Sequence, residues 1–233
     1  MIIAFLLNTD FSFVYFKIKF NFAFQSSFMI KNNYQEDLSH IRSMMERSTR
    51  FISLSGFSGI SAGLFAILGA SYVYFLFKKS GVEYFNPYQN IELAPLIPHL
   101  IITAIVVLVL SIGFGIFFTV NKSRKKNLPI WTNTTKDLLY NLFLPLVIGG
   151  LFCIGLIYHS YFVLLAPATL IFYGLALINA SKYTYSDIEF LGITECVIGV
   201  LSMLLLGWGL LFWSLGFGVA HIVYGIIMYK KYD

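Results

Sequence analysis

The sequence predicts an all-α membrane protein, a polytopic bundle of six transmembrane helices preceded by a short amphipathic cytoplasmic helix. Of the 233 residues, 58% are hydrophobic and only 12% are charged. Soluble domains carry about 25% charged and about 45–50% apolar residues, so a soluble fold of this length would leave much apolar surface in water. The apolar residues also form runs of about 20, the length that a helix needs to cross a membrane.

Residues 1–28 fit neither a signal peptide nor a span. Their first apolar run is interrupted early, without preceding basic residues or a following small-residue cleavage site. The stretch FSFVYFKIKFNFAF alternates like a β-strand, yet a lone strand beside a helical bundle has no sheet to join. We expect either that these residues lie upstream of a true start at Met29, or that they form a disordered or membrane-surface arm.

Residues 29–50 are predicted to contain the amphipathic helix. Leu38, Ile41 and Met45 recur at helical spacing, with Met44 adjoining them. The polar side is supplied by six charged residues, Glu36, Asp37, Arg42, Glu46, Arg47 and Arg50. Such a helix either lies along the membrane surface or offers a docking or dimerisation surface to a cytoplasmic partner.

Residues 51–233 form the predicted transmembrane domain. The six expected spans are Phe51–Phe77, Ala94–Val120, Leu138–Tyr158, Tyr161–Ala180, Asp187–Leu206 and Gly209–Tyr229. Pro145 and Pro167 fall inside the third and fourth spans, where proline is expected to kink or break a helix.

Basic residues set the expected orientation. If both termini are cytoplasmic, twelve lysines and arginines flank the spans inside and only Lys78 and Lys79 flank them outside. We therefore expect a multi-pass protein of the cell inner (plasma) membrane, with both outer lysines reaching toward the membrane surface. The basic loop at 121–136 is interpreted as an anchor against the lipid bilayer.

The net charge of +5 does not indicate nucleic-acid binding, because the basic residues lie beside apolar segments. No phosphate-binding loop, complete dinucleotide motif, zinc-protease motif or serine-hydrolase motif occurs. Cys153 and Cys196 lie inside predicted spans without metal-ligand spacing, and we read them as small apolar residues. We expect no cofactor and no metal, and no recognisable enzyme.

Small residues mark expected packing surfaces. Ser55, Gly59 and Gly63 repeat every four residues in the first span, and Gly216 and Gly218 lie in the last. Small residues at this spacing let helix backbones approach closely in a membrane. The contact is either within one chain or between copies in a homo-oligomer.

Glu195 is the unusual residue of the fifth span. Ser186 and Glu189 have the spacing of a capping box, which predicts that the helix begins near Asp187. Glu195 is eight residues farther along, about 12 Å into the membrane at 1.5 Å per residue. A charged group in mid-span costs about 2.5–3.5 kcal/mol on insertion scales.

His221 lies at the matching depth of the sixth span. It is thirteen residues after Trp208, where the turn is expected, and Glu195 is thirteen residues before it. A carboxyl and an imidazole on adjacent antiparallel helices at one level form a candidate ligand-binding or proton-binding pair. The alternative is a polar clamp between helices, often worth only about 0.6 kcal/mol.

Two blocks of the sequence resemble a group of small bacterial inner-membrane proteins of no assigned function. The first is EDLSHIRSMMERSTRF followed by GFSGISAGLFAILGA, and the second is LGITE with GWGLLFWSLGFGVAHIVYGIIMYKK. The resemblance covers roughly residues 29–233 and leaves residues 1–28 outside it. It implies an inner-membrane location and six spans, and it brings no catalytic residues.

Three classes of function follow. The first is a membrane interaction or signalling component, which would use the amphipathic helix and the basic loops to meet a cytoplasmic partner. The second is a small-solute or proton-coupled transporter that uses Glu195 and His221. An intramembrane enzyme is the weakest of the three, because no set of catalytic residues is found.

Overall fold

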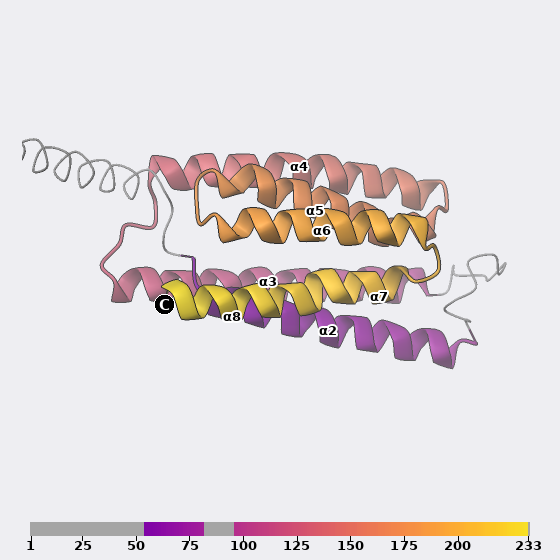
Figure 1. Ribbon diagram of the computed structural model, residues 1–233. Helices are drawn as coiled ribbons and strands as arrows, with labels where there is room; N and C mark the ends of the chain where they lie inside the picture. Colours follow the sequence, from indigo (N-terminus) through magenta and orange to yellow (C-terminus); the bar gives the residue numbers. More distant parts are fainter. Residues whose placement is uncertain (1–53, 82–95, 233) are drawn as a thin grey trace, which may run out of the picture. The chain divides into compact units, whose positions relative to one another are not determined.

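The computed structural model describes residues 54–81 and 96–232, and within these ranges it is helical and has no strand (Figure 1). The chain divides into two units, Met1–Thr49 and Arg50–Asp233, and the described residues belong to the second. The predicted arm at 1–28 and the predicted amphipathic helix at 29–50 lie outside the described residues.

The described helices follow the predicted spans with shifts of a few residues at their ends. They are α2 (Gly56–Lys79), α3 (Ile97–Lys125), α4 (Asn133–Tyr158), the short 3₁₀ turn η1 (Phe162–Leu164), α5 (Leu165–Ser181), α6 (Asp187–Leu204), α7 (Gly209–Trp213), η2 (Ser214–Ala220) and α8 (His221–Tyr232). The last three are consecutive and form one helical rod.

Five helical segments are long and apolar enough to cross a membrane. They are Gly56–Lys79, Ile97–Lys125, Asn133–Tyr158, Phe162–Ser181 and Gly209–Tyr232. Helix α6 is not among them, since its eighteen residues include three carboxylates, Asp187, Glu189 and Glu195. The first two lie in its first turn, so Glu195 is the acidic residue of its apolar part.

The helices pack as two groups joined through α5 and α6. Helix α2 packs against α3 and against the η2–α8 part of the last rod, while α5 packs between α4 and α6. Helix α6 contacts α7, η2 and α8, and α5 contacts α7, which links the groups (Figure 1). The interface at α6 therefore buries residues from both halves of this unit.

Glycine brings α5 and α6 into close contact. A Cβ atom on Gly174 would lie 2.6 Å from the carbonyl oxygen of Gly192, and one on Gly192 would lie 2.7 Å from that of Gly174. These distances leave no room for a side chain on either backbone. The reciprocal contact fixes the level at which the two helices cross, about one turn from Glu195.

Neither proline breaks its helix, so the expected break is wrong at both positions, while the expected kink stays a prediction. Helix α4 runs through Pro145 from Asn133 to Tyr158 as one helix. Pro167 is the third residue of α5, in the first turn, where backbone N–H groups have no intrahelical partner to lose. The irregular segment near this proline is η1, which ends at Leu164, just before α5 begins.

The expected capping box at Ser186 is also wrong, although α6 does begin at Asp187. Ser186 has helical backbone angles, φ −61° and ψ −26°, and its side chain makes no capping hydrogen bond. A capping side chain works from an extended backbone, which this tight connection does not provide. A capping box does occur at the start of α4, where Thr132 and Thr135 bond reciprocally.

Candidate functional site

Glu195 lies on the buried face of α6. The buried residues of this helix recur at helical spacing, and Glu195 is among them with 0% of its surface exposed. Neither of its carboxyl oxygens has a hydrogen-bond partner. Burying a carboxyl in this way is costly, most of all when it is ionised, so the position requires a specific neighbour.

That neighbour is His221, the first residue of α8. Its Nδ1 atom lies 3.2 Å from Oε1 of Glu195, and its side chain is only 7% exposed. The two candidates that the sequence placed at one level are therefore brought together. The approach has the distance of an ion pair but not the geometry of a hydrogen bond, because Nδ1 is aimed at another oxygen.

The other oxygen is the carbonyl of Gly216, 3.1 Å from the same Nδ1 atom. A carbonyl can only accept, so Nδ1 carries the hydrogen. On the far side of the ring, Nε2 lies 2.9 Å from the hydroxyl of Tyr173 in α5. The imidazole is thus held at both nitrogens, by one residue of η2 and one of a third helix.

The position of Gly216 depends on the helix type just before His221. Residues Ser214–Ala220 form a π-helix, in which hydrogen bonds span five residues. Gly216 and His221 are five apart, which is the span of a π-helical hydrogen bond, and the imidazole of His221 donates to this carbonyl. Segments of π-helix are frequent at functional sites.

Gly216 also makes room for the carboxyl. A Cβ atom at this position would overlap Oε2 of Glu195 and would lie 2.5 Å from Cδ2 of Leu170. The lack of a side chain at position 216 therefore leaves the space that Glu195 occupies. The sequence marked Gly216 as a packing residue, and here the group packed against it is the carboxyl.

Ser202 is a second buried polar residue of α6 without a hydrogen-bond partner. It is 0% exposed and seven residues beyond Glu195, two turns along the same helix face. A Cβ atom on Gly209, the first residue of α7, would lie 4.0 Å from its hydroxyl oxygen. Glu195 and Ser202 are thus two unpartnered polar groups along the interface of α6 with the last rod.

Sequence reasoning did not identify Tyr173 or Ser202. Tyr173 is one of fifteen tyrosines, and nothing in its neighbourhood distinguishes it. Ser202 could have been found from its seven-residue spacing to Glu195, because that spacing places both on one helix face.

The packing candidates of the first span lie against the last rod. A Cβ atom on Gly59 would lie 3.1 Å from Cα of Gly225, and one on Gly63 would lie 2.5 Å from the carbonyl oxygen of Gly218. Ser55 precedes α2 and its carbonyl accepts from the hydroxyl of Ser58 at 2.5 Å. The contact that these glycines make in the structure is within one chain.

Charged groups gather where α2 begins and α3 and α8 end. Nζ of Lys122 donates to the carbonyl of Leu54 at 2.8 Å, and Nζ of Lys126 donates to that of Tyr232 at 2.8 Å. Asp187 accepts from Lys231 at 3.0 Å and from the hydroxyl of Tyr232 at 2.6 Å. These contacts define what we call the basic end of the bundle.

The described residues contain no group of three or more histidine, cysteine, aspartate or glutamate residues that could hold a metal ion. Cys196, next to Glu195 in the sequence, directs its Sγ toward the carbonyl of Ile171 at 3.6 Å. The site therefore consists of a carboxyl, an imidazole and a phenol, which are groups that exchange protons.

Comparison with protein families, with curated proteins and with solved structures finds no match to this chain.

Proposed function

We propose that the chain is a multi-pass membrane protein with six crossings, in which α6 is the crossing that carries the functional carboxyl. Five other segments are long and apolar enough to cross. Eighteen residues at 1.5 Å each give α6 about 27 Å, close to the thickness of the hydrocarbon core. With α6 included, successive helices alternate in direction. The first and last residues that the structure describes, 54 and 232, then lie on the same side of the membrane.

Orientation in a cell inner (plasma) membrane follows from charge. The basic end joins Lys122, Lys126 and Lys231 to helix ends on that side. Cytoplasmic loops are enriched in lysine and arginine, so we assign the basic end to the cytoplasm. Both termini are then cytoplasmic.

The proposed function is proton-coupled transport of a small solute, with Glu195 as the proton-binding group. The observation that carries this proposal is a fully buried carboxyl, both of whose oxygens lack a hydrogen bond, 3.2 Å from an imidazole. An ionisable residue inside a membrane segment marks an ion or substrate pathway by default. A purely structural clamp would satisfy its own polar atoms, and this one does not.

The proton has two places to reside. With Nδ1 of His221 donating to Gly216, the imidazole can be neutral and the carboxyl protonated. A small rotation would redirect Nδ1 from that carbonyl to Glu195, 3.2 Å away, and favour an imidazolium–carboxylate pair. In the first arrangement the proton is on the carboxyl, and in the second it is on Nε2, which then donates to the hydroxyl of Tyr173. Only the first arrangement keeps the hydrogen bond from Nδ1 to η2, which couples proton transfer to the π-helix.

The first test is infrared difference spectroscopy of the reconstituted chain between acid and neutral pH. Proton binding at Glu195 predicts a carboxyl C=O band that Glu195→Gln removes. The matched control is Glu189→Gln, which alters an exposed carboxylate of the same helix. A band that persists in Glu195→Gln, or no titration of this carboxyl, would contradict the proposal.

The second test is water access at the site. In a background with Cys153→Ala and Cys196→Ala, single cysteines at positions 195 and 202 are exposed to a small water-soluble thiol reagent from each side. Ser202→Cys keeps the carboxyl in place and changes one atom. Labelling that changes side with the direction of a pH gradient supports transport. No labelling from either side, with full labelling after denaturation, excludes it.

A membrane interaction or signalling component is the second candidate. What favours it is the complete burial of Glu195, which gives the carboxyl no contact with solvent in this conformation. In that case the cluster would be a dry clamp between helices, and the absence of thiol labelling would be the expected result. The amphipathic helix that would serve such a function lies outside the described residues.

A further inference from the structure

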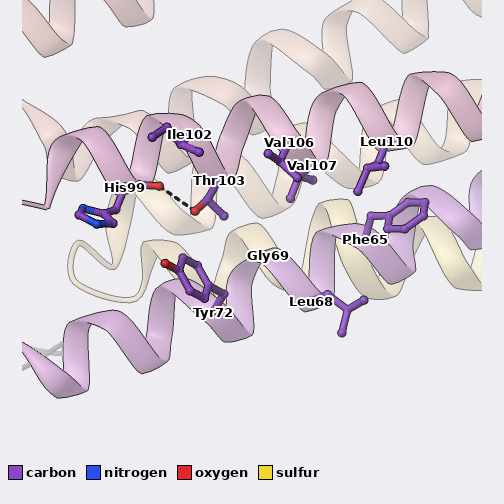
Figure 2. Close-up of a pocket in the computed structure, with 10 residues that line it drawn as sticks. All are labelled: Phe65, Leu68, Gly69, Tyr72, His99, Ile102, Thr103, Val106, Val107 and Leu110. Carbon is purple, nitrogen blue, oxygen red and sulfur yellow. Dashed lines mark hydrogen bonds between the residues drawn. The ribbon is translucent and has the colours of Figure 1, made fainter.

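An apolar groove lies between α2 and α3, helices that take no part in the Glu195 cluster (Figure 2). Its volume is about 430 Å³, within the range of roughly 300–1,000 Å³ typical of ligand pockets. Phe65, Gly69 and Tyr72 of α2 and Thr103, Val106 and Leu110 of α3 contribute to its wall.

The groove exists because the two helices touch along a narrow line. A Cβ atom on Gly69 would lie 2.5 Å from Cγ2 of Val107, so α2 and α3 are in close contact there. Beside this line, Leu68 is 58% exposed and Val106 is 49% exposed. Apolar side chains therefore border the groove without filling it.

The polar atoms at one end of the groove are arranged so that its wall stays apolar. The hydroxyl of Thr103 donates to the carbonyl of His99 at 2.7 Å, within the same helix (Figure 2). The imidazole of His99 is exposed at the first turn of α3. A histidine thus stands where the apolar wall ends.

A lysine continues the groove face of α2 at the same end. Lys79 is fourteen residues after Phe65 and seven after Tyr72, so helical spacing places it on the face that forms the groove. Lys78 is rotated from it by about 100° around the helix. The groove is therefore apolar along its length and carries basic side chains at one end.

We propose that this groove binds one anionic phospholipid, with an acyl chain along the contact of Gly69 and Val107 and the phosphate at Lys79 and His99. Apolar length and terminal positive charge are complementary to such a lipid. The proposal does not depend on the function of Glu195. Binding of the lipid phosphate would also explain why Lys79 lies on the proposed outer side, where basic residues are few.

The test is native mass spectrometry of the full chain, reconstituted with equal amounts of phosphatidylglycerol and phosphatidylcholine and then extracted in detergent. Val106→Trp fills the groove, and Val109→Trp places the same side chain on an α3 position that is 62% exposed and does not line it. We expect the wild type and Val109→Trp to retain one phosphatidylglycerol. Val106→Trp should reduce this retention by about tenfold or more, because the acyl chain loses its place.

The charge is tested at the helix end, where folding is not at risk. Lys79→Gln should lower phosphatidylglycerol retention by about fivefold and leave phosphatidylcholine unchanged, while Lys78→Gln should have little effect. Inorganic phosphate in excess should not displace the lipid, since the acyl chain contributes to binding.

Three results would overturn the proposal. One is equal retention by the two tryptophan variants while both remain monodisperse with unchanged helical circular dichroism. Another is lipid retention that does not depend on the headgroup or on Lys79, or release of the lipid by inorganic phosphate. The third is a lipid-free dimer that Val106→Trp abolishes, which would mean that a second copy of the chain covers the groove.

Discussion

Replacing Gly63 by alanine tests whether close backbone contact between α2 and the last rod holds the bundle together. The new Cβ atom would lie 2.5 Å from the carbonyl oxygen of Gly218 and 3.0 Å from the backbone nitrogen of Ile222. Ordinary contact begins near 3.4 Å, so the overlap is close to 1 Å. Both atoms belong to the backbone, and the helices must therefore separate.

The cost follows from that separation. Overpacking of this kind costs about 1–3 kcal/mol, and a gap of about 0.5–1 Å forfeits a quarter to a half of the dispersion attraction where it opens. Alanine in place of glycine returns about 0.5–1 kcal/mol of helix propensity. We expect Gly63→Ala to lower the free energy of unfolding by about 1–2 kcal/mol.

Gly150→Ala is the matched control, because a Cβ atom on Gly150 in α4 has no atom within 4 Å. It should leave stability unchanged or raise it by up to about 1 kcal/mol. The assay is titration of the purified chain from mixed micelles into sodium dodecyl sulfate, followed by circular dichroism. Equal stability of the two variants would refute the packing argument. A loss that depended on protein concentration would place the contact between chains.

Three other variants test other contacts. Tyr173→Phe leaves Nε2 of His221 without a partner and should cost about 0.6–1.7 kcal/mol in the same titration, and no loss would mean that the hydroxyl does not hold the ring. Lys122→Met removes the hydrogen bond to Leu54 and should speed hydrogen exchange in the first turn of α2, whereas exchange as slow as in wild type would count against it. Asp187→Asn removes the negative charge that faces Lys231 but keeps an acceptor oxygen, and it should cost about 1 kcal/mol or less, with less effect in high salt; a larger, salt-independent loss would show a different role.

The order and approximate bounds of the helices could be predicted because length and apolar content alone separate membrane-type helices from their connections. The capping motif predicted local contacts less well. The start of α6 was expected correctly at Asp187, yet the capping box behind that expectation does not form. Ser186 was read as a cap from spacing alone, whereas capping also requires an extended backbone, which the tight connection from α5 does not permit.

The level of Glu195 and His221 could be predicted for a different reason. In two antiparallel helices joined by a tight turn, residues equally far from the turn lie at the same depth, whichever way their side chains face. The direction in which they face depends on helix rotation, and that is set by packing with other helices. Tyr173 could not be predicted for this reason, because the face that α5 turns toward the pair depends on the contact of Gly174 with Gly192.

The π-helix supplies a contact of the site that the equal depth of Glu195 and His221 does not explain. Nδ1 of His221 donates at 3.1 Å to the carbonyl of Gly216, which belongs to this π-helix and lies five residues back. The missing side chain at position 216 also leaves room for the carboxyl of Glu195. A glycine opposite a buried carboxyl group therefore indicates more than close packing. It allows the carboxyl to enter the interface, and the backbone there competes with the carboxyl for the proton-bearing nitrogen.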